Sequence, residues 1–221
     1  MWLRQARNEL GWTQAQTASR LGVSQGYLSL LEAGKRTVSP GLARSFERLL
    51  HVPATALRPR ERNVNDPAAL AKELAALGYE PLAYLGRETA ANPAGVLLSA
   101  LRQRDLESRL TEALPWVVLA YPELNWNWLV ERTKVHDAQN RLGYVVSLAR
   151  QLAETQNPSA VETLLEQENH LERSRLAAEG TLCQDSMTQA ERRWLRNNRP
   201  QSAADWNLLT NLKADDLPYA A

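Results

Sequence analysis

The clearest pattern of apolar and polar positions lies in residues 12–36, WTQAQTASRLGVSQGYLSLLEAGKR. Apolar residues recur at helical spacing from Ala15 to Leu21, directly after Thr13, a residue type that caps helix N-termini. Gly22 follows, and glycine adopts the left-handed backbone of a sharp turn at little cost. The pattern therefore predicts a short helix that ends in a tight turn at this glycine.

A second short helix is predicted directly after the turn. Ser24 is its expected N-cap, residues 25–33 form the helix, and Gly34 ends it. Leu28 and Leu31 are expected to face the first helix, which leaves a polar face exposed near the start of the second. This arrangement is typical of a helix-turn-helix, which places its second helix in the DNA major groove. The alternative is an ordinary antiparallel helix pair joined by a glycine turn.

Further helices are predicted on both sides of this pair. Residues 2–10 form an amphipathic helix with Arg4 and Arg7 on its outward face, and a capped helix begins after Ser39. Through the segments LRQARNELGWTQ, LGVSQGYLSLLEAGKR and LLHVP, residues 2–59 resemble the lambda-repressor-like, or Xre, family of DNA-binding domains. The resemblance implies a small five-helix domain that binds double-stranded operator DNA.

Single residues of the expected DNA interface receive roles from side-chain chemistry and from this resemblance. The Gln25 amide can pair with adenine through two hydrogen bonds, and the matching position in the family usually reads bases. The resemblance also implies that Gln14 grips a phosphate and braces the second helix, and that Lys35 and Arg36 anchor phosphates. The complete predicted DNA-binding set is Gln14, Ser24, Gln25, Gly26, Tyr27, Ser29, Leu30, Lys35 and Arg36.

Four members of this set have less specific roles. The Ser29 hydroxyl can donate to a base or to a phosphate. Gly26 and Leu30 depart from the polar residues often found at these positions in the family, and Leu30 can instead contact a thymine methyl group. Tyr27 is interpreted mainly as a packing residue with a solvated hydroxyl. Direct base readout therefore depends on few hydrogen bonds.

Charge divides the 221-residue chain into two contrasting parts. Residues 1–62 contain ten Lys and Arg against four Asp and Glu, a balance of +6, whereas the remaining residues balance at −5. A basic segment can neutralise DNA phosphates, and an acidic one is repelled by them. The first part is thus expected to bind DNA, and the second must have another partner.

The expected organisation is all-α, with two domains and a short linker. The helix-turn-helix domain occupies residues 1–59, the linker 60–66, and a mostly helical dimerisation or partner-binding domain 67–221. Helices are predicted from Asp66-Pro67 to a stop at Gly78, and again after Asn92-Pro93. The apolar run LPWVVLAYP at 114–122 fits either a buried helical turn or a strand.

A coiled-coil-like stripe is the strongest periodic signal in the second domain. Apolar residues at alternating spacings of three and four indicate one helix over 128–152, namely Val135, Ala138, Leu142, Val145, Ala149 and Leu152. The helix either packs inside its own domain or binds a partner, which is a second copy of the chain or another protein. Further helices are predicted at 159–179, where Glu168 and Arg175 interrupt the stripe, and in the tail at 188–197 and 202–212.

Tryptophan is concentrated in the second domain, which contains no phenylalanine. Core filling is the default role for such residues, but tryptophan is also enriched at the energetic centres of protein interfaces. The segment YPELNWNWL at 121–129 is acidic and loop-like. The predicted partner-binding residues are Trp116, Trp126 and Trp128.

The sequence indicates no enzyme, no cofactor and no metal site. His136 and Asp137 are adjacent, so on a helix they point apart, and the run Glu168-Asn-His170 lacks the second histidine of a metal motif. Lone Cys183 is expected to be inert. No apolar run reaches membrane-spanning length and the first residues form no signal peptide, so a cytoplasmic location is expected.

One possible exception concerns self-cleavage. Some repressors of this family carry a self-cleaving Ser/Lys domain that cuts an Ala-Gly bond, and this chain has Ala94-Gly95 after the linker. The following residues, LLSALRQRDLESRLTEAL, have helical periodicity, whereas that catalytic domain is rich in strands. Self-cleavage is therefore not expected.

Two functions from different classes remain open. Long stretches of residues 85–212, including RETAANPAGVLLSALRQRDL, RSRLAAEGTLCQDSMTQAERRWLRNNRP and WNLLTNL, resemble the C-terminal half of Xre-type regulators paired with nucleotidyltransferase-type toxins. This resemblance implies an antitoxin of a type II toxin–antitoxin system, which represses its own operon and neutralises a toxin by direct binding. The alternative is a homodimeric transcriptional repressor that has a dimerisation or ligand-sensing domain and no toxin partner.

Overall fold

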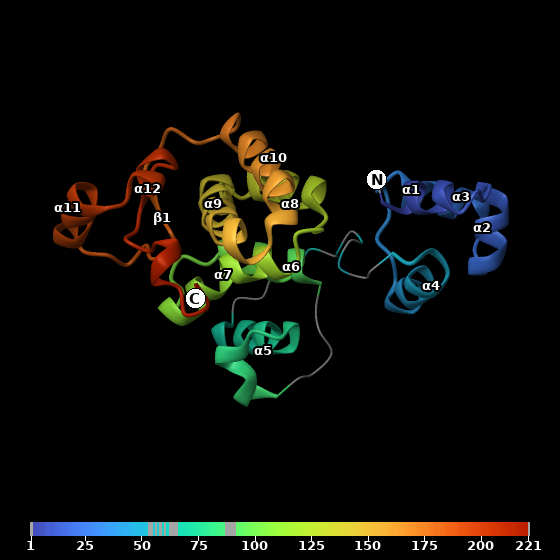
Figure 1. Cartoon of the computed structure of the whole chain (residues 1–221), viewed down its shortest axis with the longest axis horizontal. Coiled ribbons are helices and arrows are strands. Elements are labelled where there is room, and N and C mark those ends of the chain that lie inside the picture. Colours follow the sequence, from blue (N-terminus) through green and yellow to red (C-terminus); the bar gives the residue numbers. More distant parts are fainter. Residues whose placement is uncertain are drawn as a thin grey trace. The chain divides into compact units, whose positions relative to one another are not determined.

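The computed structural model describes residues 2–52, 66–86 and 92–220, together with residues 55, 57, 59 and 61. Two compact units are present (Figure 1). The first comprises Met1–Glu61 with Glu123–Asn125, and the second comprises Arg62–Pro122 with Trp126–Ala221. Within the expected linker at 60–66, only residues 61 and 66 are described.

Four α-helices form the described part of the first unit: α1 (Trp2–Glu9), α2 (Gln14–Leu21), α3 (Gln25–Glu32) and α4 (Pro40–Leu50). A fifth helix was expected, but residues 53–65 are only partly described and the described ones form no α-helix. The buried core of this unit consists of Leu3, Ala18, Leu21, Leu28, Leu31, Phe46, Leu50, Val52 and Leu57. The apolar positions that predicted α2 and α3 supply four of these nine residues, so the helical periodicity and the packing agree.

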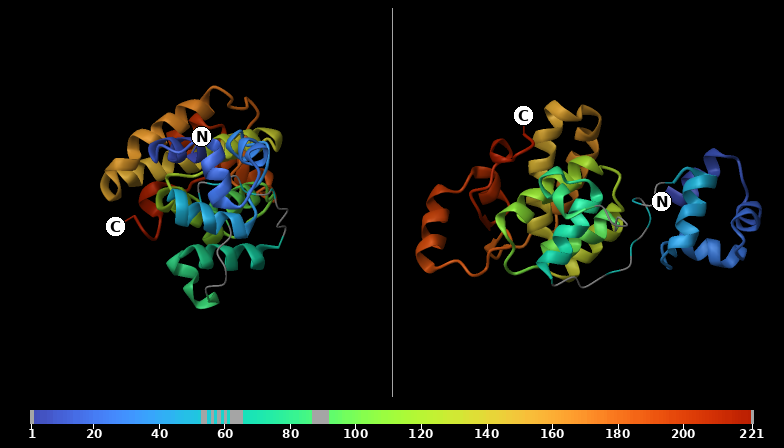
Figure 2. Two further views of the ribbon diagram at one scale, coloured as in Figure 1. Left: turned by 90° about the vertical axis from the view of Figure 1, so that its right-hand side faces the viewer. Right: turned by 90° about the horizontal axis from the view of Figure 1, so that it is seen from below.

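The second unit is built mainly from helices. They are α5 (Pro67–Leu77), α6 (Pro93–Leu101), α7 (Ser108–Ala120), α8 (Trp126–Val135), α9 (Gln139–Gln156), α10 (Val161–Glu172), α11 (Gln189–Asn198) and α12 (Gln201–Asp205). Short 3₁₀ turns are η2 (Glu80–Leu85), η3 (Pro158–Ala160) and η4 (Ala214–Asp216). Helix α9 packs against α10 and α7 (Figure 2), and its residues form the centre of the core. The all-α fold class is therefore confirmed.

Several helix starts and stops lie where local signals predicted them. The Asp66 carboxylate accepts a hydrogen bond from the backbone of Ala68 at 3.0 Å and caps α5, which ends at Gly78 in a left-handed conformation. Asn92 caps α6 in the same way through the Ala94 backbone. Each cap satisfies an N–H group that the first helical turn leaves without a partner.

The apolar run at 114–122 is helical as far as Ala120. It lies mostly in α7, and Pro115 stands inside that helix. Leu114, Val117 and Val118 are fully buried, so the uniformly apolar sequence reflects a helix covered on most sides. The strand alternative is excluded for these residues.

The prediction of one continuous helix over 128–152 is wrong, because the chain turns between α8 and α9 and forms two helices there. Asp137 adopts a left-handed backbone with φ of 53°, and Val135 is 60% exposed. The rest of the stripe is buried inside the second unit: Ala138, Leu142, Val145, Ala149 and Leu152. The alternative of packing within its own domain is therefore correct for α9, because its part of the stripe is buried in the unit's own core.

Two other expected helices are shorter than predicted. The helix expected at 159–179 is α10, which ends at Glu172 and leaves Ala178 exposed. Glu168 interrupts its apolar stripe because its carboxylate pairs with Arg150 of α9 at 2.6 Å. The helix expected at 202–212 is replaced by α12 and a short strand. That strand, β2 (Leu208–Leu209), pairs in parallel with β1 (Gly180–Thr181), a contact between residues too distant in sequence for periodicity to indicate.

Among the residues that the structure describes, no helix is long and apolar enough to cross a membrane.

Candidate DNA interface

Helices α2 and α3 are joined by the tight turn that the sequence predicted. Thr13 and Gln16 form a reciprocal capping box at the start of α2, with backbone-to-side-chain distances of 2.9 and 3.2 Å. Gly22 ends α2 in a left-handed conformation with φ of 69°. The Ser24 hydroxyl then accepts a hydrogen bond from the Tyr27 backbone at 3.2 Å and caps α3. Local capping alone thus defines both ends of the turn.

Helix α3 has one buried side and one exposed side. Leu28 is fully buried and Leu31 is 4% exposed, and both belong to the core of the first unit. The predicted base-reading positions face solvent: Gln25, Gly26, Ser29 and Leu30. Tyr27 is half-buried and packs against the core cluster, in agreement with its interpretation as a packing residue. The exposed face therefore carries the polar side chains of Gln25 and Ser29 together with Gly26 and Leu30.

A buried ion pair holds α3 from behind, and it corrects the expectation that Arg7 points outward. The Arg7 side chain turns into the core, where its Nε donates to the Glu32 carboxylate at 2.6 Å and its Nη2 to the other oxygen at 3.3 Å. The Arg7 Nη1 also donates to the backbone carbonyl of Trp12 at 2.8 Å. The two side chains are 10% and 4% exposed, so α1 is fixed to the end of α3 by a shielded, bidentate contact.

Gln14 completes this arrangement from the first residue of α2. Its amide donates to the Glu32 carboxylate at 2.9 Å, so three helices meet at one carboxylate. Burial by itself raises the pKa of Glu32, but the hydrogen bonds from Arg7 and Gln14 outweigh it and lower the pKa below its ordinary value. The carboxylate is therefore charged at neutral pH. The resemblance had indicated a bracing role for Gln14, and this contact supports it.

Two cations follow α3 directly on the surface. Lys35 and Arg36 are exposed, and the Lys35 backbone donates to the Leu30 carbonyl at 2.9 Å, which closes the helix end. A further cation lies on α2, where the Arg20 guanidinium is 4.0 Å from the centre of the Trp12 ring. Helix periodicity did not indicate the Arg20 contact, because it joins α2 to the preceding loop.

The predicted partner-binding tryptophans are mostly part of the core, which corrects their assignment as interface anchors. Trp126 is 9% exposed and its indole N–H donates to the Pro122 carbonyl at 2.8 Å, while Trp128 is 3% exposed. Trp116 is half-buried, and its ring centroid lies 5.2 Å from that of Tyr79. By contrast, Trp194 on α11 is 56% exposed.

Cys183 and Ala94, which were considered for reactivity, are both buried in the packed structure. Burial raises the pKa of the Cys183 thiol to about 11, which disfavours the reactive thiolate. Ala94 is fully buried within α6, so the Ala94-Gly95 bond belongs to a packed helix. Among the described residues, no group of three or more His, Cys, Asp and Glu is arranged to hold a metal ion.

Comparison with known proteins identifies the first unit. A protein-family model described as "Helix-turn-helix" matches residues 3–57, about a quarter of the chain. No curated protein and no solved structure matches the chain. The matched segment contains α2 to α4, all of α1 except its first residue, and every residue of the predicted DNA interface. Residues 3–57 thus form a helix-turn-helix domain of the lambda-repressor-like type, and this match supports a DNA-binding transcription regulator.

Proposed function

We propose that this protein is a sequence-specific transcription regulator that inserts the exposed face of α3 into the major groove of operator DNA. The observation that carries the proposal is the two-sided environment of α3. Its apolar side and its Glu32 carboxylate are held by the core, whereas the face with Gln25 and Ser29 is open to solvent. A rigidly held helix with a free polar face is what direct readout of base edges requires.

Within this interface, the contacts divide into base readout and positioning. The Gln25 amide pairs with adenine N6 and N7, and Leu30 contacts a thymine methyl group. Gln14, Lys35 and Arg36 contact phosphates and fix the orientation of α3 on the duplex. Ser24 contributes as the helix cap, since its hydroxyl already accepts from the Tyr27 backbone.

The base-reading role is tested by nuclease footprinting of the DNA upstream of the protein's own gene. Full-length protein should protect a defined site, and Gln25→Ala should weaken that protection because a bidentate base contact is lost, at about 1–3 kcal/mol or roughly 5- to 150-fold. Gln5→Ala is the matched control, because Gln5 is exposed on α1 and its amide donates to Glu9 of the same helix at 3.0 Å. Equal effects of the two variants would refute the assignment of Gln25.

The phosphate-binding role is tested by salt dependence. Each phosphate contact contributes about 0.9 to the slope of log affinity against log salt concentration. The double variant Lys35→Gln, Arg36→Gln should therefore flatten the slope by about 1.8. Because these contacts carry no sequence information, the variant should weaken binding to operator and unrelated duplexes alike. An unchanged slope would exclude both residues from the interface.

We further propose that the protein binds DNA as a homodimer. One short recognition helix contacts only a few base pairs, and discrimination across a genome normally needs two half-sites about one helical turn apart. The buried stripe of α9 does not serve as the dimer contact, so dimerisation uses another surface. Protection of two related half-sites in the footprint supports the dimer, and protection of one short site by a monomer would contradict it.

A second candidate function is that of an antitoxin, favoured by the acidic balance of residues 63–221 and their resemblance to toxin-paired regulators. An acidic surface complements a basic, nucleic-acid-acting enzyme such as a nucleotidyltransferase-type toxin. The test is co-expression of the full-length protein with the neighbouring gene. That gene should inhibit growth alone and be tolerated with the wild type or with Gln25→Ala, which separates neutralisation from repression. A harmless neighbouring gene would remove the antitoxin function and leave the repressor.

A further inference from the structure

Helix α11 carries an exposed tryptophan that the DNA-binding function does not use. Trp194 stands in the middle of this ten-residue helix and is 56% exposed. The residues that share its face at helical spacing are also exposed: Ala190, Arg193 and Asn197. Tryptophan and arginine are among the residues most enriched at the energetic centres of protein interfaces. This face of α11, which we call the Trp194 face, therefore has the composition of a protein-binding surface.

The other side of α11 is fixed to the second unit, so the Trp194 face is held in a defined position. Leu195 is only 7% exposed. The guanidinium groups of Arg196 and Arg199 both pair with the Glu179 carboxylate, at 2.7 and 3.3 Å. A surface that is held in place in advance loses less entropy when it binds a partner.

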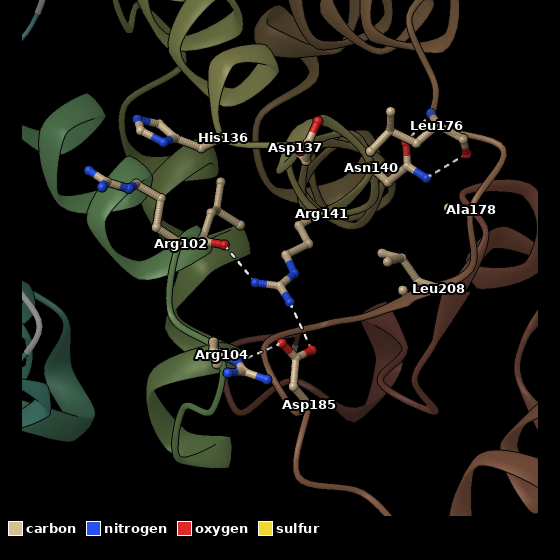
Figure 3. Close-up of a pocket in the computed structure, with 12 residues that line it drawn as sticks. Arg102, Arg104, His136, Asp137, Asn140, Arg141, Leu176, Ala178, Asp185 and Leu208 are labelled. Carbon is tan, nitrogen blue, oxygen red and sulfur yellow. Dashed lines mark hydrogen bonds and ion pairs between the residues drawn. The ribbon is translucent and has the colours of Figure 1, made fainter.

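The loop that leads into α11 is also held by hydrogen bonds. The Asp185 carboxylate pairs with Arg141 of α9 at 3.1 Å (Figure 3) and accepts from the Thr181 hydroxyl at 2.6 Å. The backbone carbonyl of Asp185 accepts a hydrogen bond from Nη2 of Arg192 at 2.7 Å. Of the three arginines within α11, only Arg193 has neither a hydrogen-bond nor an ion-pair partner among the described residues. Its guanidinium is therefore available to a carboxylate of a partner.

Helix α10 presents a second exposed face with the same spacing. Its residues are Glu162, Leu165, Glu166 and Asn169, and we call it the Leu165 face. Leu165 is 44% exposed. In the described part of the chain, the carboxylates of Glu162 and Glu166 have no hydrogen-bond or ion-pair partner. The Leu165 face therefore combines an exposed apolar residue with two available carboxylates.

The two faces complement each other when the helices run antiparallel. Both faces have their exposed residues at positions i, i+3, i+4 and i+7, so an antiparallel alignment pairs the two inner positions of one face crosswise with those of the other. This alignment places the Trp194 ring against Leu165. It also places the Arg193 guanidinium against the Glu166 carboxylate, a contact between opposite charges. A parallel alignment would instead set each of these charged residues against an apolar one.

In the observed fold, one chain does not bring these two faces together. Figure 1 shows α11 at one edge of the second unit, apart from α10, and α11 packs on β2 whereas α10 packs on α9. A second copy of the chain, by contrast, supplies the matching face for each helix. The complementary charges of the two faces therefore favour a copy of this chain as the partner.

We propose that the Trp194 face of one copy binds the Leu165 face of a second copy, and that the reciprocal contact closes a twofold symmetric dimer. The helix pair then occurs twice, which increases the buried area toward the about 1,200–2,000 Å² of stable interfaces. This inference rests on the homodimer proposed above, and it names the surface that forms the dimer.

Charge reversal tests this contact by sedimentation equilibrium of the full-length protein. The wild type should have the mass of two chains at about 100 μM, well above the micromolar dissociation constants of weak complexes. Arg193→Glu and Glu166→Arg should each weaken association roughly ten-fold or more, because each sets like charges against each other at both contacts. Lys72→Glu makes the same change of charge at an exposed residue of α5 and should associate like the wild type.

A mixture of the two charge-reversal variants gives the more specific test. In a mixed dimer, the reversed α11 of one chain faces the reversed α10 of the other, and the second contact has the wild-type charges. At a concentration at which Arg193→Glu and Glu166→Arg are each mostly monomeric, their mixture should therefore contain dimers. Dimerisation on mixing also shows that both variants are folded.

The apolar part of the contact is tested by Trp194→Ala. This variant should associate roughly ten-fold or more weakly than the wild type, as expected when an interface tryptophan is lost. In protein diluted until the dimer has dissociated, the free energy of unfolding should stay close to that of the wild type, because Trp194 is exposed in the single chain. Circular dichroism of the dilute protein establishes that each variant is folded. If a charge-reversal variant is not, Arg193→Ala and Glu166→Ala should still weaken association.

Several results would overturn the proposed contact. A dimeric wild type whose association is unchanged by both charge reversals would exclude this surface and leave the homodimer. A monomeric wild type at the same concentration would exclude both, without affecting the role of Gln25, which footprinting tests separately. A mixture that does not dimerise would also contradict the contact. The same holds if Arg193→Glu keeps the dimer mass but loses affinity for DNA or for the product of the neighbouring gene, because the Trp194 face would then bind that partner.

Discussion

At the scale of single residues, the Glu32 carboxylate determines how the DNA-binding unit is held together. It lies in α3 and accepts hydrogen bonds from Arg7 of α1 and Gln14 of α2. A buried charge that loses its partner is strongly destabilising, whereas a satisfied pair fixes geometry. The orientation of α3 therefore depends on a buried group on the side opposite its exposed face.

Replacing this carboxylate should destabilise the first unit. In Glu32→Gln, Arg7 remains buried without a countercharge, and the free energy of unfolding should fall by about 3–5 kcal/mol. The measurement is urea denaturation of the full-length protein followed by circular dichroism. The matched control is Glu154→Gln, which breaks an exposed pair with Arg150 and should cost about 0.3–0.5 kcal/mol. Similar losses in both variants would contradict the buried pair.

The same carboxylate predicts a dependence on pH. Because hydrogen bonds from Arg7 and Gln14 overcome the effect of burial, the folded pKa of Glu32 lies below its ordinary value of 4.5. The stability from this ionisation is fully present above the unfolded pKa and is lost as pH falls through the folded pKa. The decline in unfolding free energy below pH 4.5 should therefore be shallower in Glu32→Gln than in the wild type. Parallel declines would show that Glu32 has no altered pKa.

Tryptophan substitutions distinguish core residues from surface residues in the second unit. Trp128→Ala should lower the free energy of unfolding by about 3–5 kcal/mol, because a large side chain that is 3% exposed leaves a cavity. Trp194→Ala, at a site 56% exposed, should change it by only about 0.5 kcal/mol. Calorimetry of the two full-length variants measures the difference. A destabilised Trp194 variant with an unaffected Trp128 variant would reverse these assignments.

The orientation of single side chains was the least predictable feature of the sequence. Arg7 was expected outside because arginine is rarely buried, and only its pairing with Glu32, 25 positions away, makes the buried position favourable. Trp126 and Trp128 had two interpretations because residue type alone does not decide between core and interface. In contrast, the exposure of Gln25 and Ser29 followed directly from the apolar positions opposite them on α3.

At the scale of elements, a helix boundary was predictable where the hydrogen bond that fixes it joins residues close together in the sequence. The N-caps at Thr13, Ser24, Asp66 and Asn92 bond within three residues, so the sequence indicates them directly. The turn between α8 and α9 has no proline or glycine, and the heptad-like stripe continues across it. Asp137 has the left-handed backbone of this turn. Aspartate tolerates that conformation, but an aspartate in the sequence does not by itself predict a turn. The β1–β2 pairing joins segments 28 residues apart and was likewise not predictable.

A single helical glycine provides a test of the packing around α9. A Cβ atom at Gly143 would overlap the ring of Trp206, which is 4% exposed and cannot easily move. Gly143→Ala should therefore destabilise the second unit by about 1–3 kcal/mol, although alanine is intrinsically the better helix former. Thermal denaturation of the full-length protein measures the change.

Gly41 of α4 is the matched control for this substitution. It is also helical, but nothing lies within 4 Å of an added Cβ. Gly41→Ala should leave the protein unchanged or stabilise it by up to about 1 kcal/mol. A stabilising Gly143→Ala would show that the ring of Trp206 does not lie against α9 as described.

At the scale of the whole molecule, the change from basic to acidic net charge and the boundary between the two units both lie near residue 62. Residues 1–62 carry a balance of +6 and contain the helix-turn-helix domain, while the acidic remainder contains nearly all of the second unit. Association with DNA is steered by the basic part and opposed by the acidic part. The basic charge that DNA binding requires is thus concentrated in the part of the chain that carries the helix-turn-helix domain.

The central claim is that the exposed face of α3 reads DNA sequence, and in vitro selection from random duplexes tests it most directly. Full-length wild type should enrich one motif with two related half-sites about one helical turn apart. Gln25→Ala should enrich the same motif with relaxed preference at one position in each half-site, because an adenine contact is lost. Failure of the wild type to enrich any motif, or an unchanged preference in Gln25→Ala, would contradict the claim.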